Sequence, residues 1–391
     1  MNVAVAYDCL YPFTIGGAEK WYRGVAERLA ARHRVSYLTR RQWSGEAAPA
    51  LGPNLDVVTV CGPAPLYGES GRRRIAPTLA YGAGLLRHLV RNRRRYDVIH
   101  VASFPFFSVL AARAAEAIGG PPCVVDWLEV WSREGWEGYL GGSRGRVGGA
   151  IQQLCIRLSR TALVHSELHR RRLEEAGCPT PPHLLRGLYG GPVEGTCRPG
   201  ERAPLVVFAG RLIADKGVAS IPAAIAIARR RVPALEAVIF GDGPARAQVE
   251  QEIDRLGLHG AVRCAGFVAE PELREALGRA MCLALPSARE GYGLVVVEAA
   301  AFGTPSVVLR ARESAAGELI AHGENGLVID GGTPEELAAA LLELHARGAE
   351  ISRSTRAWFA RCARDLSIDT SIATLESIYS AAAQRDAWSR P

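Results

Sequence analysis

The stretch CLALPSAREGYGLVVVEAAAFGTPSVVL, residues 282–309, contains a complete strand, loop, helix and strand in that order. Residues 282–285 form an apolar run of strand length, residues 294–302 have helical spacing, and residues 305–309 form a second apolar run. A helix between two such strands is typical of parallel strands joined by a crossover connection. The glycine-rich loop after residue 285 follows a strand end, where parallel sheets bind their ligands.

The same alternation of apolar runs and helical stretches extends through both halves of the chain. In the first half we expect strands at residues 3–6, 35–38, 57–60, 98–101, 123–126 and 162–164, with helices such as 18–32, 76–92 and 106–117. In the second half we expect strands at 204–209, 237–240, 262–264, 282–285, 305–309 and 327–329, with helices near 217–231, 244–256, 271–279, 294–302 and 334–347. The sequence therefore predicts an α/β protein with two doubly wound, Rossmann-like domains.

The pattern divides the chain into two domains and a closing helix. Residues 1–190 form the first expected domain and residues 200–365 the second. The passage 187–200 is rich in glycine and proline and has the composition of an interdomain connection. Residues 350–386 are helical by pattern, and 366–386 form the expected final helix.

The composition excludes several classes of protein. With 391 residues, 48% hydrophobic and 22% charged, the chain is neither disordered nor a coiled coil. No apolar run reaches the roughly 18 residues of a membrane span, and the amino end lacks the basic leader of a signal peptide, so we expect a cytoplasmic protein. The nine cysteines have no zinc-ligand spacing, so we expect reduced thiols and no bound metal.

Positive charge is concentrated in the first half. Residues 1–200 carry 26 Lys and Arg against 16 Asp and Glu, whereas residues 201–391 carry 21 against 24. A solvated, arginine-rich exterior is the favoured explanation of this excess, and an acidic substrate is an alternative. An anionic membrane surface is an alternative partner, with peripheral contact at the inner membrane face through arginine-rich helices at 86–95 and 144–160. Nucleic acid is disfavoured as a partner, because the arginine clusters lack interleaved aromatic residues.

Two strand-to-helix loops carry candidate anion-binding residues. Gly16 and Gly17 follow the first strand, where glycines let the backbone approach a ligand and a helix amino end offers unpaired N–H groups. Gly210, Arg211 and Lys216 follow the first strand of the second domain, and Lys216 is one of only two lysines. Two cations there would neutralise a diphosphate in a chain that has no Asp-x-Asp motif for a metal. The alternative for the first loop is a simple turn. The alternative for the second loop is a pair of exposed basic side chains without a ligand.

The loop after residue 285 adds two carboxylates. Glu290 stands on the turn, and Glu298 lies in an apolar helical run, which predicts a buried carboxylate with hydroxyl partners. An amphipathic helix with Glu298 facing water is the alternative. The N–H groups at Gly293 and Leu294 open that helix and point toward an anion. The candidate ligand-binding residues on these and the neighbouring strand-end loops are Gly16, Gly17, Gly210, Gly241, Phe267, Gly291, Tyr292, Gly293, Leu294 and Glu298.

With these motifs the chain resembles the retaining glycosyltransferases of family 4, which have the GT-B fold. The likeness covers nearly the whole chain and is most specific in Glu290-x7-Glu298, supported by Gly210–Gly217 and Gly16–Glu19. It implies two Rossmann-like domains facing across a nucleotide-sugar cleft, the first for the acceptor and the second for the donor, with the final helix returning to the first domain. It also implies that Arg211 and Lys216 hold the donor diphosphate, Glu290 the hydroxyls of the transferred sugar, and Glu298 the ribose hydroxyls.

One loop departs from the pattern of the family. Many relatives have a histidine after the strand at 123–126, whereas this chain has Asp126 and Glu129 as its nearest polar groups. Asp126 is therefore a candidate catalytic group. His100 and His165, at the ends of the neighbouring strands, join Glu129 as candidates on the acceptor side, with a structural role as the alternative.

The resemblance implies an enzyme that transfers a sugar from a nucleoside diphosphate donor, of UDP or GDP type, to an acceptor hydroxyl. It further implies retained anomeric configuration, with no metal and no other cofactor. Glycans, lipid-linked intermediates and small molecules are all compatible acceptors. A sugar-nucleotide epimerase, a glycosyl phosphorylase and a non-catalytic nucleotide-sugar-binding partner share the fold and remain alternatives.

Overall fold

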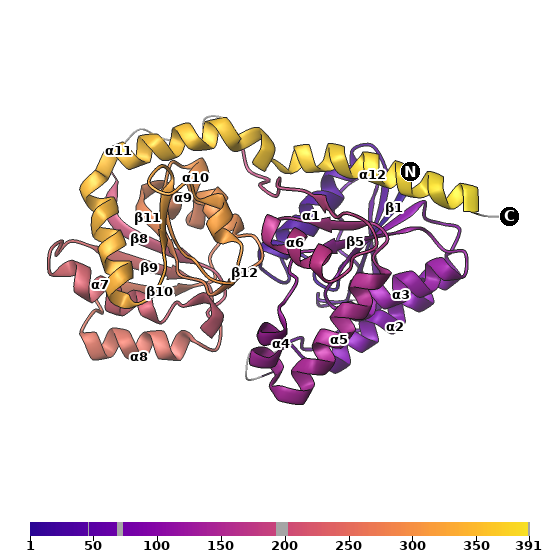
Figure 1. Ribbon diagram of the computed structural model, residues 1–391, viewed down its shortest axis with the longest axis horizontal. Helices are drawn as coiled ribbons and strands as arrows, with labels where there is room; N and C mark the ends of the chain where they lie inside the picture. The colour runs from indigo at the N-terminus through magenta and orange to yellow at the C-terminus, as the bar shows by residue number, and fades with distance from the viewer. Residues whose placement is uncertain (46, 69–72, 193–201, 390–391) are drawn as a thin grey trace. The chain divides into compact units, whose positions relative to one another are not determined.

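The structure is a computed structural model that describes residues 1–45, 47–68, 73–192 and 202–389. These residues form two compact units, each with its own parallel sheet (Figure 1). The first unit comprises the described chain up to Gly190 together with the part from Ile368 onward, and the second comprises the described part of Gly191–Ser367. Residues 193–200 of the expected connection, including Cys197, lie outside the described residues. The other eight cysteines are unpaired thiols.

The first unit is built on a seven-stranded parallel sheet in the order β3-β2-β1-β4-β5-β6-β7. Its strands are β1 (Asn2–Ala6), β2 (Arg34–Arg40), β3 (Leu55–Cys61), β4 (Val98–Ala102), β5 (Cys123–Trp127), β6 (Ala162–Val164) and β7 (His183–Leu184). Strands β4 and β5 are buried at every position, as expected for strands with helices on both faces of the sheet. All six predicted strands are present, and β7 is too short to give a pattern.

Helices cover both faces of this sheet (Figure 1). They are α1 (Gly17–Ala30), α2 (Ile75–Arg91), α3 (Phe106–Ala117), α4 (Arg133–Leu140), α5 (Gly142–Leu158), α6 (Glu167–Glu175) and α12 (Ile368–Ser389). Helix α3 packs between α2 and α5, α5 packs on α4, and α12 packs on α1. The prediction of a helix at 86–95 is wrong at the carboxyl end. The helix ends at Arg91, and Arg95 lies in the turn that follows it.

The second unit contains a six-stranded parallel sheet in the order β10-β9-β8-β11-β13-β15. Its strands are β8 (Ala203–Ala209), β9 (Glu236–Phe240), β10 (Val262–Gly266), β11 (Ala280–Leu285), β13 (Ser306–Leu309) and β15 (Gly326–Ile329). A separate two-stranded ladder joins β12 (Arg289–Glu290) to β14 (Glu313–Ser314). Its helices are α7 (Ser220–Arg229), α8 (Arg246–Leu256), α9 (Glu270–Arg279), α10 (Leu294–Ala301) and α11 (Pro334–Leu366), with 3-10 turns η1 (Ala214–Lys216) and η2 (Ala316–Leu319).

The end of the chain returns to the first unit. Gly348 has non-helical torsions (φ 48°, ψ −121°), so α11 is two helical segments, which meet between the stretches expected to be helical at 334–347 and 350–386. After Ser367 the chain enters α12, whose buried Ile372, Leu375 and Tyr379 belong to the first unit. The predicted return of the final helix is confirmed.

The strand orders define a ligand-binding edge in each sheet. The order reverses between β1 and β4 in the first sheet and between β8 and β11 in the second. Open parallel sheets bind ligands outside the carboxyl ends of the strands at such a switch point. The predicted fold class, two doubly wound parallel sheets, is therefore confirmed. Across the described ranges, no helix combines the length and the apolar character that crossing a membrane requires.

Candidate active site

The switch point of the second sheet brings two of the predicted donor loops side by side. One follows β8 and includes Asp215, and the other follows β11 and includes Ala288 and Arg289. The Ala288 N–H donates to the Asp215 carbonyl at 2.8 Å, and Arg289 Nη1 lies 3.3 Å from Asp215 Oδ2. Gly217 permits this approach, because a Cβ built on it would lie 2.3 Å from the Pro286 carbonyl oxygen. The loops are therefore held in a fixed mutual position.

Lys216 lies where these loops meet. Its ammonium group donates to Glu290 Oε2 at 2.6 Å and to the Arg289 carbonyl at 3.2 Å. The side chains of Lys216 and Glu290 are 14% and 17% exposed. Glu290 is held in turn by the β12–β14 ladder and by the Ala315 N–H, which donates to its carbonyl at 2.8 Å. A cation and a carboxylate, predicted for different parts of one ligand, thus lie close enough to pair with each other.

Helix α10 begins directly after this pair. Gly293 precedes it with φ 97°, a left-handed conformation that favours glycine, and no side chain caps its first turn. Its first N–H groups therefore remain available to an anion. Glu298 is partly exposed, contrary to the expectation of a buried carboxylate, because its neighbours Val297 and Ala299 point into the interior instead.

The other predicted donor residues lie on the same or adjacent strand-end loops. Gly210 and Gly241 approach so closely that a Cβ on Gly241 would lie 1.9 Å from the Gly210 carbonyl oxygen. Arg211 is exposed, as is Phe267 after β10 (54%), whereas Gly291 and Tyr292 are buried. Within the described ranges, no group of three or more His, Cys, Asp and Glu residues is arranged to hold a metal ion.

In the first unit, the predicted glycine loop leads into α1. Gly16 has extended torsions (φ 177°), and Gly17 is the first residue of the helix. A Cβ on Gly16 would lie 2.3 Å from Glu19 Oε2, so the missing side chain leaves room for the buried Glu19 carboxylate. Glu19 accepts a hydrogen bond from the Tyr7 hydroxyl at 3.1 Å. This contact ties the start of α1 to the end of β1.

Asp126 is the centre of a buried hydrogen-bond network. Its Oδ2 accepts from Trp21 Nε1 at 2.8 Å and lies 3.0 Å from His100 Nε2, while its Oδ1 lies 2.6 Å from His165 Nε2. The side chains of Asp126, His100 and His165 have 0% exposure. The network joins β4, β5 and β6 to α1, and His100 Nδ1 extends it to the Tyr379 hydroxyl of α12 at 2.6 Å.

The network has a defined charge distribution. The ring of His165 faces an acceptor at each nitrogen, because Nδ1 lies 2.9 Å from the Leu185 carbonyl and Nε2 faces Asp126. A carbonyl and a carboxylate can only accept, so whichever ring nitrogen carries a proton has an acceptor within hydrogen-bond distance. Burial by itself would raise the pKa of Asp126, but the charge of His165 and the hydrogen bonds from both histidines hold that pKa well below its usual range.

This arrangement favours the structural alternative for His100 and His165, and it favours a structural role for Asp126, which was expected to be catalytic. All three are enclosed in the interior and bound to one another. Glu129 differs from them, because it is partly exposed and its Oε2 accepts from Trp131 Nε1 at 2.6 Å. Among the candidates on the acceptor side, Glu129 is thus the one with surface available to a ligand.

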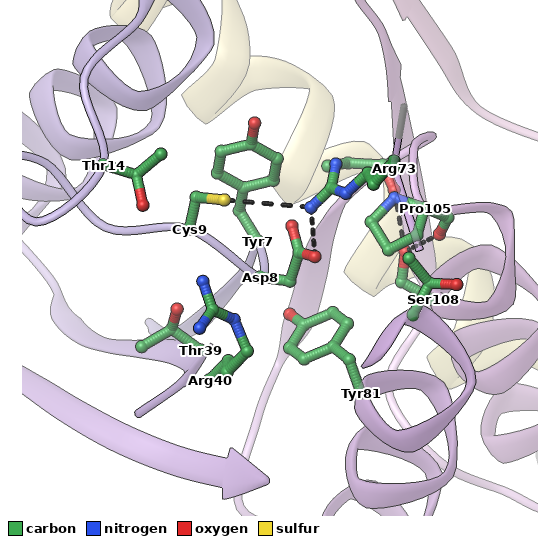
Figure 2. Close-up of polar contacts among 12 residues, drawn as sticks. Tyr7, Asp8, Cys9, Thr14, Thr39, Arg40, Arg73, Tyr81, Pro105 and Ser108 are labelled. Carbon is green, nitrogen blue, oxygen red and sulfur yellow. Dashed lines mark hydrogen bonds and ion pairs between the residues drawn. The ribbon is translucent and has the colours of Figure 1, made fainter. Parts of the chain in front are cut away.

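The sequence analysis missed a second polar cluster in the first unit. Asp8 follows β1 and forms an ion pair with Arg73, whose Nη2 also lies 3.8 Å from Cys9 Sγ (Figure 2). Arg40, the last residue of β2, is buried in the same region. The sequence does contain a pattern that indicates this cluster. A charged residue follows each of two predicted strands within two positions, at the edge where parallel sheets bind ligands.

Comparison with known proteins agrees with this architecture. Residues 16–186 match the family described as glycosyl transferase 4-like domain, and residues 198–356 match glycosyl transferases group 1. The chain is 27% identical to glycogen synthase of Mycobacterium tuberculosis over 406 aligned residues, covering 97% of this chain and 94% of that protein. It is 34% identical over 154 residues to a GDP-mannose-dependent phosphatidylinositol monomannoside mannosyltransferase of the same species, covering 38% of this chain and 39% of that one.

Solved structures share the fold. Sucrose-phosphate synthase from Thermosynechococcus elongatus superposes with a TM-score of 0.80 at 15% identity, covering 97% of this chain and 98% of that one. The HepE protein of Anabaena in complex with UDP superposes with a TM-score of 0.73 at 19% identity, covering 97% and 100%. The two parallel sheets with their helices are those of the GT-B fold. The chain belongs to the GT-B glycosyltransferases, with a 4-like first domain and a group 1 second domain.

Proposed function

We propose that this glycosyltransferase moves a sugar from a nucleoside diphosphate to an acceptor hydroxyl, without a metal ion and with retained anomeric configuration. The observation that supports it most is the convergence of Lys216, Glu290 and the amino end of α10 at the β8–β11 switch point. Retention rests on the resemblance to family 4. UDP complexes of the structural neighbour HepE support a nucleotide donor, and UDP and GDP remain the two candidate types.

In the proposed mechanism, preorganised charge does the catalytic work. As the bond between sugar and diphosphate breaks, negative charge grows on the phosphate oxygens. Arg211, Lys216 and the N–H groups at Gly293 and Leu294 would stabilise this charge, and fixed donors do so without reorganising during the reaction. Glu290 would accept hydrogen bonds from the sugar hydroxyls, and Glu298 from the ribose hydroxyls. The departing phosphate would take the proton of the acceptor hydroxyl, so no carboxylate nucleophile is required.

A calorimetric titration tests the donor part of this proposal. We expect UDP or GDP to bind the full-length protein with 1:1 stoichiometry, and with unchanged affinity in excess EDTA, because protein cations replace the metal. Product analysis with and without added acceptor or phosphate separates a transferase from an epimerase and a phosphorylase. Donor binding without any turnover would instead support a non-catalytic binding partner. A requirement for a divalent ion in binding or turnover would contradict metal independence.

We also propose peripheral contact between α5 and an anionic membrane surface. Helix α5 has three arginines and no acidic residue, and its Val147 and Leu154 are 60% and 49% exposed. Exposed apolar side chains beside arginines suit an interfacial helix. We expect the protein to sediment with vesicles containing phosphatidylserine at low salt, and Val147→Glu to reduce the bound fraction several-fold. Equal sedimentation with uncharged vesicles, or none with either kind, would exclude this contact.

A further inference from the structure

A charged cluster lies at the switch point of the first sheet, at the same kind of edge as the proposed donor site in the second. Asp8 follows β1, Arg40 ends β2, and Arg73 stands two residues before α2. Figure 2 shows the guanidinium groups of Arg40 and Arg73 on two sides of the Asp8 carboxylate. Charged groups are seldom fully buried unless they are paired. The pairing of each group therefore indicates whether the cluster is complete without a ligand.

Arg40 is a buried cation that is bound by a backbone carbonyl. The residue is 6% exposed, and its Nη1 donates to the Ala64 carbonyl at 2.9 Å. Among the residues that the structure describes, no Asp or Glu forms an ion pair with it, and its buried Nε has no acceptor. A guanidinium carries five N–H donors, and leaving a buried charge without compensation is costly. An anion beside Arg40 would remove that cost.

Asp8 and Arg73 neutralise each other but keep unused hydrogen-bonding atoms. Asp8 is 0% exposed, and its Oδ2 pairs with Arg73. Its Oδ1 has no hydrogen-bond partner in the described part of the chain, and neither does Arg73 Nε. Arg73 also lies over the ring of Phe104, 5.1 Å from its centroid, which fixes the guanidinium on its other side. The pair thus offers one acceptor and one donor to a further group.

Within the part of the chain that the structure describes, Asp8 pairs with Arg73, whereas Arg40 donates to a backbone carbonyl. The thiol of Cys9 lies among these charges: burial, Asp8 and Glu19 raise its pKa, whereas Arg73 and Arg40 lower it. A ligand that satisfies the cluster therefore needs an anionic oxygen group for Arg40 and a hydroxyl for the free oxygen of Asp8.

We propose that Asp8, Arg40 and Arg73 form an anion subsite, which binds a phosphate group carried by the acceptor next to one of its free hydroxyls. The phosphate contacts Arg40, and the hydroxyl donates to Asp8 Oδ1. That this ligand is the acceptor rests on the proposed function, whereas the anion subsite itself does not. The proposal narrows the acceptor to a phosphorylated polyol or sugar.

The experiment measures thermal stabilisation of the full-length protein by inorganic phosphate and by glycerol 3-phosphate, with glycerol and sodium chloride at matched ionic strength as references. We expect saturable stabilisation by both phosphates, with tighter binding of glycerol 3-phosphate because it adds the hydroxyl for Asp8. In Arg40→Gln we expect at least ten-fold weaker binding of both ligands. The ligand-free variant should melt at or above the wild-type temperature, because an uncompensated charge has been removed.

Two further variants make the outcome decisive. In Lys216→Ala, phosphate should still stabilise the protein against thermal denaturation, because that lysine belongs to the other unit. Phosphate should stabilise Arg229→Gln as well. Arg229 donates to the Leu235 carbonyl at 2.6 Å and serves as a matched arginine with one backbone contact. Loss of the effect in Lys216→Ala but not in Arg40→Gln would place the phosphate at the donor site and overturn the proposal. So would the absence of saturable stabilisation in the wild type, or a lowered melting temperature of Arg40→Gln, which would indicate a structural arginine. The nucleoside diphosphate titration tests the proposed function separately.

Discussion

Replacement of Lys216 by alanine is expected to lower the turnover number by about 10²–10³, equivalent to about 3–4 kcal/mol of transition-state stabilisation. The ammonium group is held 2.6 Å from Glu290 and has little exposed surface, so its charge is only weakly screened by water. In the proposed mechanism it faces the oxygens on which negative charge grows. The measurement is steady-state turnover at saturating donor. A suitable control is Arg255→Ala, which removes an exposed cation of α8.

Glu290→Gln separates the two members of this pair. The substitution frees the ammonium group from its carboxylate, so the nucleoside diphosphate should bind at least as tightly as to the wild type. Transfer should nevertheless fall about 10-fold to 10²-fold, because hydrogen bonds from the sugar hydroxyls to a charged group are lost. Lys216→Ala should instead weaken nucleoside diphosphate binding. Near-normal turnover of Lys216→Ala at saturating donor would refute the role assigned to this lysine.

Replacement of Asp126 by asparagine is expected to destabilise the protein by about 3–5 kcal/mol, because it removes the buried carboxylate that pairs with both His100 and His165. We expect thermal denaturation to report a fall in melting temperature on the order of 10 °C. The control Asp369→Asn removes an exposed pair with Arg28, in which Asp369 is 74% exposed, and should cost less than about 1 kcal/mol.

The stability difference between wild type and Asp126→Asn depends on pH. The folded state lowers the pKa of Asp126, so its carboxylate contributes stability that is fully present above the unfolded pKa of about 3.9. That contribution is lost as the pH falls through the lower folded pKa. The gap between the two proteins should therefore narrow below about pH 4. Unchanged stability together with lost activity would instead make Asp126 a catalytic group.

Much of the fold could be predicted from local sequence. The strand at 98–101 and the helix at 106–117 were recognised from the spacing of their apolar residues. In the structure, both elements begin and end within one residue of the expected positions. Strand β7 and the ladder of β12 and β14 were missed because two-residue strands have no period. The kink of α11 at Gly348 falls in the gap between the stretches expected to be helical at 334–347 and 350–386.

The sites were less predictable, because pairing across a sheet edge leaves no local pattern. The sequence placed Lys216 and Glu290 on loops that follow strands, but it did not show that the two residues contact each other. His100, Asp126 and His165 were recognised as polar residues at strand ends. Whether such residues face a ligand or the interior depends on the partners that α1 and α12 supply from far away in the chain.

The course of the last helix has a practical consequence for dissecting the enzyme. Because α12 follows the second unit in sequence yet covers α1, neither unit corresponds to a simple amino-terminal or carboxyl-terminal fragment. A clone stopped at Gly190 would leave the binding face for Tyr379 and Leu375 bare to solvent. An isolated first unit must therefore be assembled by grafting the tail through a short artificial tether, or by circular permutation that makes the two pieces contiguous.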